Sequence, residues 1–181
     1  MKNYCMEKDK LSFLIISDSH SREDNVSEVF KKYSHMFDAA IFLGDGLRDL
    51  DVIDGRAYGM PIYCVRGNCD GFFGAYTDVP AELTLNFFGK RLLLTHGHRF
   101  DVKYGLSTLA SYAALNGYDA VLFGHTHEPE EVLVTAKDAD GNDKTVALFN
   151  PGSIGGSYAM RGTFGTLTLS EQGMLFGYGS I

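Results

Sequence analysis

The chain has 181 residues, of which 45% are hydrophobic and 22% are charged. This length and apolar content suit a single globular domain with a sizeable core and exclude a disordered chain. The formal net charge of −7 disfavours nucleic acid and anionic lipid as nonspecific partners, because most of the surface would repel a polyanion.

The first third of the sequence alternates between strand and helix patterns. Residues 1–10 read as a charged N-terminal extension, and the continuous apolar run 11–17 is typical of a buried central strand. Residues 25–33 place Val26, Val29 and Phe30 at helical spacing. Two further strands are predicted at 39–43 and 61–65, with a short helix at 47–53 between them. This order predicts parallel strands joined by crossover connections.

The pattern then changes towards antiparallel strands. Residues 82–88 and 90–95 flank Gly89 as in a hairpin, and a helix at 106–115 and a strand at 120–123 follow. The last third predicts strands at 132–136, 144–149, 163–169 and 174–178. The segment 138–143 is interpreted as a tight turn and not as a calcium loop, because Phe149 stands where the bidentate glutamate would be needed. We expect two packed sheets with helices outside, in one domain over residues 1–181.

Apolar runs and cysteines bear on the compartment. The run 11–16 is too short to span a bilayer, and no secretory signal precedes it, so we expect a protein without a membrane segment. The sequence has three cysteines, Cys5, Cys64 and Cys69, and no Cys-x-x-Cys pair. An odd number of scattered cysteines fits the reducing cytoplasm better than a disulfide framework.

Polar residues that can bind metal ions follow the apolar runs at five places. They are Asp18-Ser19-His20, Gly44-Asp45, Gly67-Asn68-Cys69-Asp70, His96-Gly97-His98 and Gly124-His125-Thr126-His127. Taken alone, Asp18 reads as a helix cap, and Asp45 and Asn68 as turn residues. Independent caps and turns, however, have no reason to collect five of the six histidines at strand ends. Their nitrogen and oxygen donors suit Mn, Fe, Ni or Zn, so the sequence predicts a two-metal site at one edge of a sheet.

The ordered set of motifs resembles the calcineurin-like metallophosphoesterase superfamily. The chain length, Cys69 and the segment 150–153 (Asn-Pro-Gly-Ser) are similar to its small bacterial YfcE-type phosphodiesterases. The resemblance implies an α/β fold, a four-layer αββα sandwich of two mixed sheets flanked by helices. It also implies that one metal is held by Asp18, His20, Asp45 and His127, and the other by Asp45, Asn68, His96 and His125, with Asp45 bridging.

Charge at such a centre favours a phosphate substrate. Two divalent ions and two carboxylates leave about two positive charges, which attract phosphate in spite of the acidic surface. The expected chemistry is hydrolysis of small phosphate esters by a metal-bridging water, with Asp45, Asn68 and His96 around it. We expect a phosphodiesterase with Mn as the first choice of metal and Fe, Ni or Zn as alternatives. A phosphomonoesterase and a catalytically silent binding module, as the retromer subunit of the superfamily is thought to be, are the competing interpretations.

Several further residues are candidates for contact with the substrate. Cys69 stands where the superfamily commonly has histidine, and a thiol with a pKa of about 8.5 is a poorer proton donor than an imidazolium near 6.5. The source of a leaving-group proton therefore stays open. His98 is a candidate for a phosphate contact or for support of His96, with an exposed side chain as the alternative. Asp70 is a candidate either for support of a metal ligand or for orienting a turn. Other candidates are the arginines Arg22, Arg66, Arg99 and Arg161. Phe72, Phe73 and Tyr76 could form a pocket wall or, as the alternative, anchor a surface loop in the core. Neither the physiological ester nor the oligomeric state follows from the sequence, and a homo-oligomer stays open.

Overall fold

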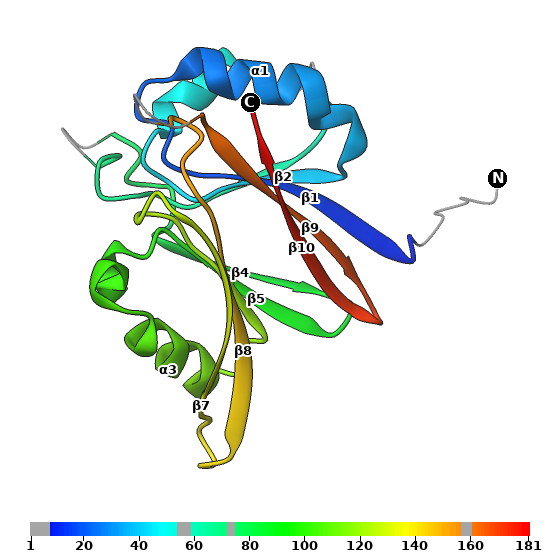
Figure 1. Ribbon diagram of the computed structural model, residues 1–181, viewed down its shortest axis with the longest axis vertical. Helices are drawn as coiled ribbons and strands as arrows, with labels where there is room; N and C mark the ends of the chain where they lie inside the picture. The colour runs from blue at the N-terminus through cyan, green and yellow to red at the C-terminus, as the bar shows by residue number, and fades with distance from the viewer. Residues whose placement is uncertain (1–7, 54–58, 72–74, 157–160) are drawn as a thin grey trace.

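A computed structural model describes residues 8–53, 59–71, 75–156 and 161–181. Two five-stranded mixed sheets form the centre of the molecule (Figure 1). The first has the order β10-β9-β1-β2-β3, with β1, β2 and β3 parallel and β9 antiparallel to both neighbours. Its strands are β1 (Lys10–Ile16), β2 (Ala39–Phe42), β3 (Ile62–Cys64), β9 (Thr163–Ser170) and β10 (Gly173–Ser180).

The second sheet has the order β4-β5-β6-β8-β7. Here β5, β6 and β8 are parallel, whereas β4 and β7 each pair antiparallel at an edge. Its strands are β4 (Glu82–Phe87), β5 (Lys90–Thr95), β6 (Ala120–Leu122), β7 (Pro129–Lys137) and β8 (Asp143–Pro151).

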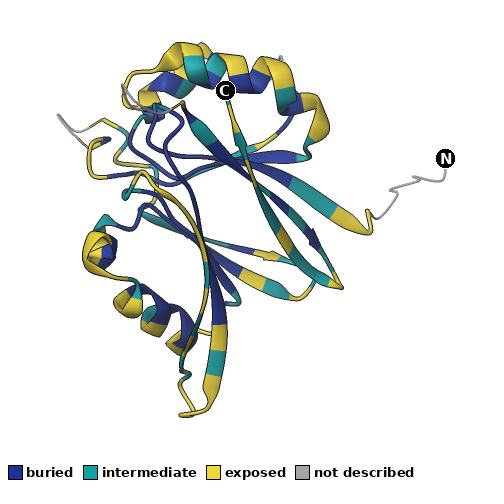
Figure 2. Cartoon of the chain, in the orientation of Figure 1, coloured by how far each residue is buried: buried dark blue, intermediate teal, exposed yellow. Residues whose placement is uncertain are grey.

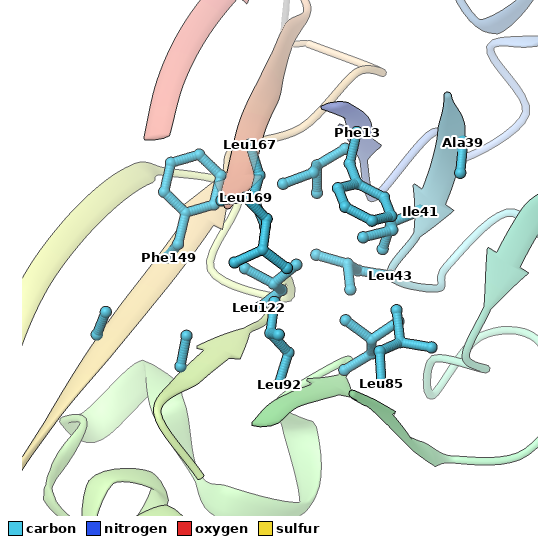
Figure 3. Packing of buried hydrophobic residues seen from close by; sticks show 14 of the residues in the cluster. Phe13, Ala39, Ile41, Leu43, Leu85, Leu92, Leu122, Phe149, Leu167 and Leu169 are labelled. Atoms are coloured by element: carbon cyan, nitrogen blue, oxygen red, sulfur yellow. The ribbon is translucent and has the colours of Figure 1, made fainter. Parts of the chain in front are cut away.

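Alternating side chains of the central strands build separate layers of core. In β1, Phe13 and Ile15 point into the core between the two sheets, which Figure 3 shows with residues such as Leu122 and Leu167 from other strands. The intervening Leu14 and Ile16 pack on the other face of the sheet. The period of two residues in a strand thus gives a fully apolar run two buried faces.

In the described part of the chain, a helix packs on the outer face of each sheet. Helix α1 (Glu23–Tyr33) buries Val26, Val29 and Phe30 on the first sheet, and α3 (Ser107–Leu115) packs on the second beside Leu93 and Val121. The outward faces of both helices are exposed in Figure 2. The α/β fold with four αββα layers that we expected is confirmed.

Most predicted elements agree with the structure to within one or two residues. The segment predicted as a short helix at 47–53 is a 3₁₀ helix, η2 (Leu47–Val52). Other 3₁₀ segments among the described residues are η1 (Ser34–Met36), η4 (His98–Phe100) and η5 (Val102–Tyr104). Strand β7 is longer than the predicted 132–136, because an edge strand with one exposed face shows a short apolar signal. Lys10, assigned to the N-terminal extension, already pairs with Ser170 in β1.

The turn expected between two strands is present. Asp138 accepts hydrogen bonds from the backbone N–H groups of Asp140 and Asn142, so the segment 138–143 holds the predicted turn between β7 and β8. Within the described ranges, we find no helix with the length and apolar content needed to cross a bilayer.

Candidate metal centre

The carboxyl ends of β1, β2, β3, β5 and β6 carry the five polar clusters of the sequence. In the first sheet, β1, β2 and β3 run parallel, so their following loops leave the same edge. A hydrogen bond of 2.7 Å between His96 Nδ1, after β5, and the carbonyl oxygen of Leu43, after β2, ties the second sheet to this edge.

The first group of donor atoms surrounds a carboxylate oxygen of Asp18. The Oδ1 atom lies 3.2 Å from Nε2 of His127, 3.6 Å from Nε2 of His20 and 3.8 Å from Nε2 of His96. The two Nε2 atoms of His20 and His127 are 3.1 Å apart. One carboxylate oxygen and two imidazole nitrogens therefore converge on one point.

Asp45 joins a second group of donors. Its Oδ2 atom lies 3.3 Å from Nε2 of His96, and the rings of His96 and His125 have centroids 5.0 Å apart. Ligand atoms of Asp45, His96 and His125 all lie within 4.8 Å of one another, and the same holds for His20, Asp45 and Cys69. Asp45 thus lies between the two groups.

Buried polar atoms without partners point into this centre. Asp18 Oδ1, His96 Nε2 and His98 Nδ1 are buried and have no hydrogen-bond partner among the described residues. Such atoms are rare in folded proteins, because removing them from water without a partner costs free energy. For His96 the bond of Nδ1–H to Leu43 leaves the Nε2 lone pair free, which is the tautomer of a metal-binding histidine. The residues present therefore fit a group of cations.

The ionisation states also suit cations. Burial alone would raise the pKa of Asp18, but contacts with His127 and His20 outweigh it and hold the pKa well below its usual value. Asp45 is likewise buried, yet its contact with His96 lowers its pKa to about 2. Burial lowers the pKa of His125 to about 4. At neutral pH the centre therefore presents two carboxylates and a neutral His125 imidazole, the forms that bind metal ions.

Five of these residues have left-handed backbone conformations. The φ angles are 56° for Asp18, 45° for His20, 58° for Asp45, 73° for His125 and 64° for His127. Residues with a Cβ atom seldom adopt such angles, which cost about 1–3 kcal/mol each and persist only where the surroundings enforce them. The strain is concentrated on the donors of this centre, as is common at functional sites.

The buried carboxylate of Asp70 joins two loops of the centre. Its Oδ2 accepts the N–H groups of Asp45 and Gly67 at 2.8 and 2.7 Å, and its Oδ1 accepts those of Gly46 and Leu47 at 2.8 and 2.9 Å. Of the two roles that the sequence left open for Asp70, the structure shows the orienting one: it fixes the turns that present Asp45 and Asn68.

Two further buried polar residues, which the sequence analysis missed, hold the other loops. Asp49 Oδ2 accepts from Ser19 Oγ at 2.5 Å and from the N–H of Ser21 at 2.8 Å, on either side of His20. Asn150 donates to the carbonyl of Gly124 and to Thr126 Oγ1, both at 3.0 Å, within the loop of His125 and His127. Local patterns carry no signal for these roles, because the partners are remote in sequence.

Asn68 and Cys69 lie together on an exposed turn. The Asn68 amide nitrogen donates to Cys69 Sγ at 3.2 Å, and the Cys69 N–H donates to Asp45 Oδ1 at 2.7 Å. Burial and the neighbouring Asp45 carboxylate raise the pKa of the Cys69 thiol to about 11. The thiol is therefore protonated at neutral pH.

The other candidates separate into those beside the centre and those away from it. The His98 ring lies 5.5 Å from that of His96 and 6.1 Å from that of His125, between centroids. Arg66 donates to the carbonyl of Thr77, Arg99 lies 3.6 Å from Glu82, and Arg22 and Arg161 line a different pocket. Phe72 and Phe73 lie outside the described residues. Arg48 lines a pocket of about 430 Å³ together with His20, Asp45, Cys69 and Tyr76.

A two-sheet sandwich with this ring of histidines and aspartates defines a class of metal-dependent phosphoesterases. The chain belongs to the calcineurin-like phosphoesterase superfamily, whose domain model matches residues 11–172. It is 32% identical to the probable metallophosphoesterase YsnB of Bacillus subtilis over 145 residues, which are 80% of this chain and 75% of that protein. The predicted family is confirmed.

Solved structures share the fold at lower sequence identity. An archaeal phosphodiesterase matches with a TM-score of 0.70 and 22% identity, over 94% of this chain and 100% of its own. Vacuolar protein sorting 29 of Cryptosporidium parvum matches with a TM-score of 0.69 and 15% identity, over 96% of this chain and 100% of its own. At these identities the likeness concerns the fold alone.

Proposed function

We propose that the protein is a metal-dependent phosphodiesterase that hydrolyses small phosphate esters at a dinuclear centre. Asp18, His20, Asp45 and His127 would hold one cation, and Asp45, Asn68, His96 and His125 the other. The convergence of the buried, unpartnered Asp18 Oδ1 and His96 Nε2 on the same centre carries this proposal. A chain that binds no cation there would have no compensation for burying these atoms.

The two cations, when bound, would acidify a water molecule and offset the negative charge that develops on the phosphate oxygens. The side chains of the protein position the donors. Asp45 is held by the Cys69 N–H at Oδ1, which leaves Oδ2 towards His96. Asn68 directs its amide nitrogen to Cys69 Sγ, and its amide oxygen would serve as the neutral donor of the second set.

The size of the adjoining pocket supports a small ester. A volume of about 430 Å³ lies in the range of small-molecule sites. Imidazole and carboxylate donors suit Mn, Fe, Ni and Zn. Of these four metals, manganese is our first choice. The free thiols of Cys64 and Cys69 support the reducing cytoplasm as the compartment. The whole chain would act as one domain, because the phosphoesterase match runs through both sheets.

A protein-binding module without turnover is the second candidate. Its support is the fold that the chain shares with vacuolar protein sorting 29. The two candidates differ in one measurable respect, since only the enzyme releases product when metal is supplied.

The test is an assay of Mn-loaded protein on bis-p-nitrophenyl phosphate and p-nitrophenyl phosphate. We expect Mn-dependent release that is faster from the diester, and a loss of at least about a hundredfold in Asp45→Asn. The control Asp24→Asn, on the first turn of α1, removes a carboxylate away from the described pocket and is expected to keep full activity. Protein that binds two cations and releases nothing from either ester would favour the binding module. Faster release from the monoester would favour a phosphomonoesterase, and protein that binds no cation would refute both the centre and the enzyme.

A further inference from the structure

The pocket beside the metal centre is lined by two kinds of residue. His20, Asp45 and Cys69 belong to the donor cluster. Arg48, from η2, and Tyr76 line the same pocket and are not part of that cluster. A ligand that fills the pocket with its phosphate at the donor cluster would therefore also meet Arg48 and Tyr76.

Arg48 is an exposed cation whose charge is available to a ligand. Among the described residues, its guanidinium forms no ion pair and no hydrogen bond. The four arginines considered from the sequence alone differ, because none of them lines this pocket. A guanidinium offers a planar set of N–H donors that matches the oxygens of a phosphate or carboxylate.

The acidic residues of the same pocket do not cancel this charge. Asp70 accepts four backbone N–H groups, and Asp49 accepts Ser19 Oγ and the N–H of Ser21. These carboxylates are buried and are compensated by their own donors. Arg48 is then the group in the described pocket that a second anion would meet.

Tyr76 gives the pocket an aromatic side chain. Its hydroxyl group donates to Asp51 Oδ2 at 3.3 Å, which fixes the direction of the phenol. Tyr76 has a φ of 54°, a conformation that side-chain-bearing residues keep only where the surroundings enforce it. An aromatic wall beside a cation suits a ligand with a flat or sugar-like body and an anionic end.

We propose that Arg48 binds a second anionic group of the substrate, so that the preferred esters are small phosphodiesters that carry a further phosphate or carboxylate beyond the scissile bond. This inference rests on the proposed phosphodiesterase function, since the scissile phosphate fixes one end of the ligand.

Two chromogenic esters that differ in a single group test the proposal. Thymidine 5′-(p-nitrophenyl phosphate) and its 3′-phosphorylated analogue both release p-nitrophenol, but only the analogue has the second anion. We expect kcat/KM of the Mn-loaded parent to be about tenfold or more higher for the analogue, mainly through KM, as one charge-assisted contact would give. In Arg48→Gln the ratio of the two kcat/KM values should fall close to one, and Arg48→Lys should retain part of it.

The control variant is Lys31→Gln, which removes one positive charge from the exposed face of α1 and should leave the ratio at the parental value. Binding provides a second readout that needs no turnover. Calorimetry of Mn-loaded protein should show thymidine 3′,5′-bisphosphate bound about tenfold more tightly than thymidine 5′-phosphate in the parent, and with equal affinity in Arg48→Gln.

The outcomes separate the two proposals. Absence of Mn-dependent release from bis-p-nitrophenyl phosphate would refute the phosphodiesterase, while the calorimetric comparison would still decide the role of Arg48. A parent that treats both thymidine esters alike, or an Arg48→Gln protein that keeps the parental ratio and the parental preference in calorimetry, would overturn the role of Arg48.

Discussion

The Nε2 atoms of His20 and His127 lie 3.1 Å apart although 107 residues separate them in the chain. Each belongs to a loop at the end of a different sheet, and both face Oδ1 of Asp18. Contact with the Asp18 carboxylate, partly opposed by burial, raises the pKa of His20. A cation that binds here would displace a proton from this histidine, so metal uptake should release protons.

Replacing His127 with alanine should weaken one of two metal sites. The loss of a direct donor should lower the affinity for one Mn ion by more than about tenfold, the scale known for supporting groups. Titration calorimetry and elemental analysis of the purified protein measure this. His35→Ala, at an exposed histidine of η1, is the control and should bind metal as the parent does. Two ions bound with parental affinity in His127→Ala would show that His127 is not a ligand.

Asp70→Asn should both destabilise the fold and lower the amount of metal bound at the centre. An asparagine has one oxygen for the four N–H groups that Asp70 accepts, and its own N–H₂ group would face some of them. We expect a loss of about 3 kcal/mol in the free energy of unfolding, measured with urea, and a lower metal content.

The matched control for Asp70 is Asp138→Asn. Asp138 also accepts backbone N–H groups, but in an exposed turn where water can replace it. Its replacement should change stability far less and leave the metal content unchanged. Equal losses in the two variants would mean that burial of Asp70 has no special role.

Gly124→Ala should disturb the Asp18 carboxylate without removing a donor. A Cβ atom at Gly124 would lie 2.1 Å from Ser17 Oγ and 2.7 Å from Asp18 Oδ2, so the β1 loop would have to shift. The expected cost is about 2 kcal/mol, with weaker metal binding. Gly71→Ala is the control, because a Cβ there meets no atom of the described residues within 4 Å. Unchanged melting temperature and affinity in Gly124→Ala would contradict the close approach.

Cys69→His should change the relative rates on diesters and monoesters and leave the metal content unchanged. A thiol with a pKa of about 11 is a weak acid near neutral pH, whereas an imidazolium can protonate a leaving group. The measurement is the ratio of kcat/KM for the two p-nitrophenyl esters. Cys64→Ala, which removes the other described free thiol within β3, should keep the parental ratio. An unaltered ratio in Cys69→His would count against a role for position 69 in choosing the ester.

The positions of the central strands could be predicted from the sequence because these strands are apolar on both faces. The run before Asp18 is buried on two sides, and so is the run before His125, which makes their ends easy to locate. The position of β9 between β1 and β10 could not be predicted, because strand order depends on long-range pairing and not on the local sequence pattern. The same limit applies to the edge strand β7, whose polar outer residues hide its true length.

The candidate metal ligands could be predicted from the sequence, but the hydrogen bonds that hold their loops in place could not. The histidines stood out because they follow buried strands, but the roles of Asp49 and Asn150 depend on hydrogen bonds to remote loops. The sequence also did not single out Arg48, because an arginine in a short helical segment looks like an ordinary surface residue. Its place in the pocket is visible only in the folded structure.

The left-handed backbone of Asp18, His20, Asp45, His125 and His127 limits how the protein can be made more robust. Glycine would relax the chain at any of these five positions, but it would delete a candidate donor at the same moment. Efforts to raise heat resistance should therefore leave this edge alone and begin at remote exposed positions, such as Leu133 on β7 and Leu175 on β10.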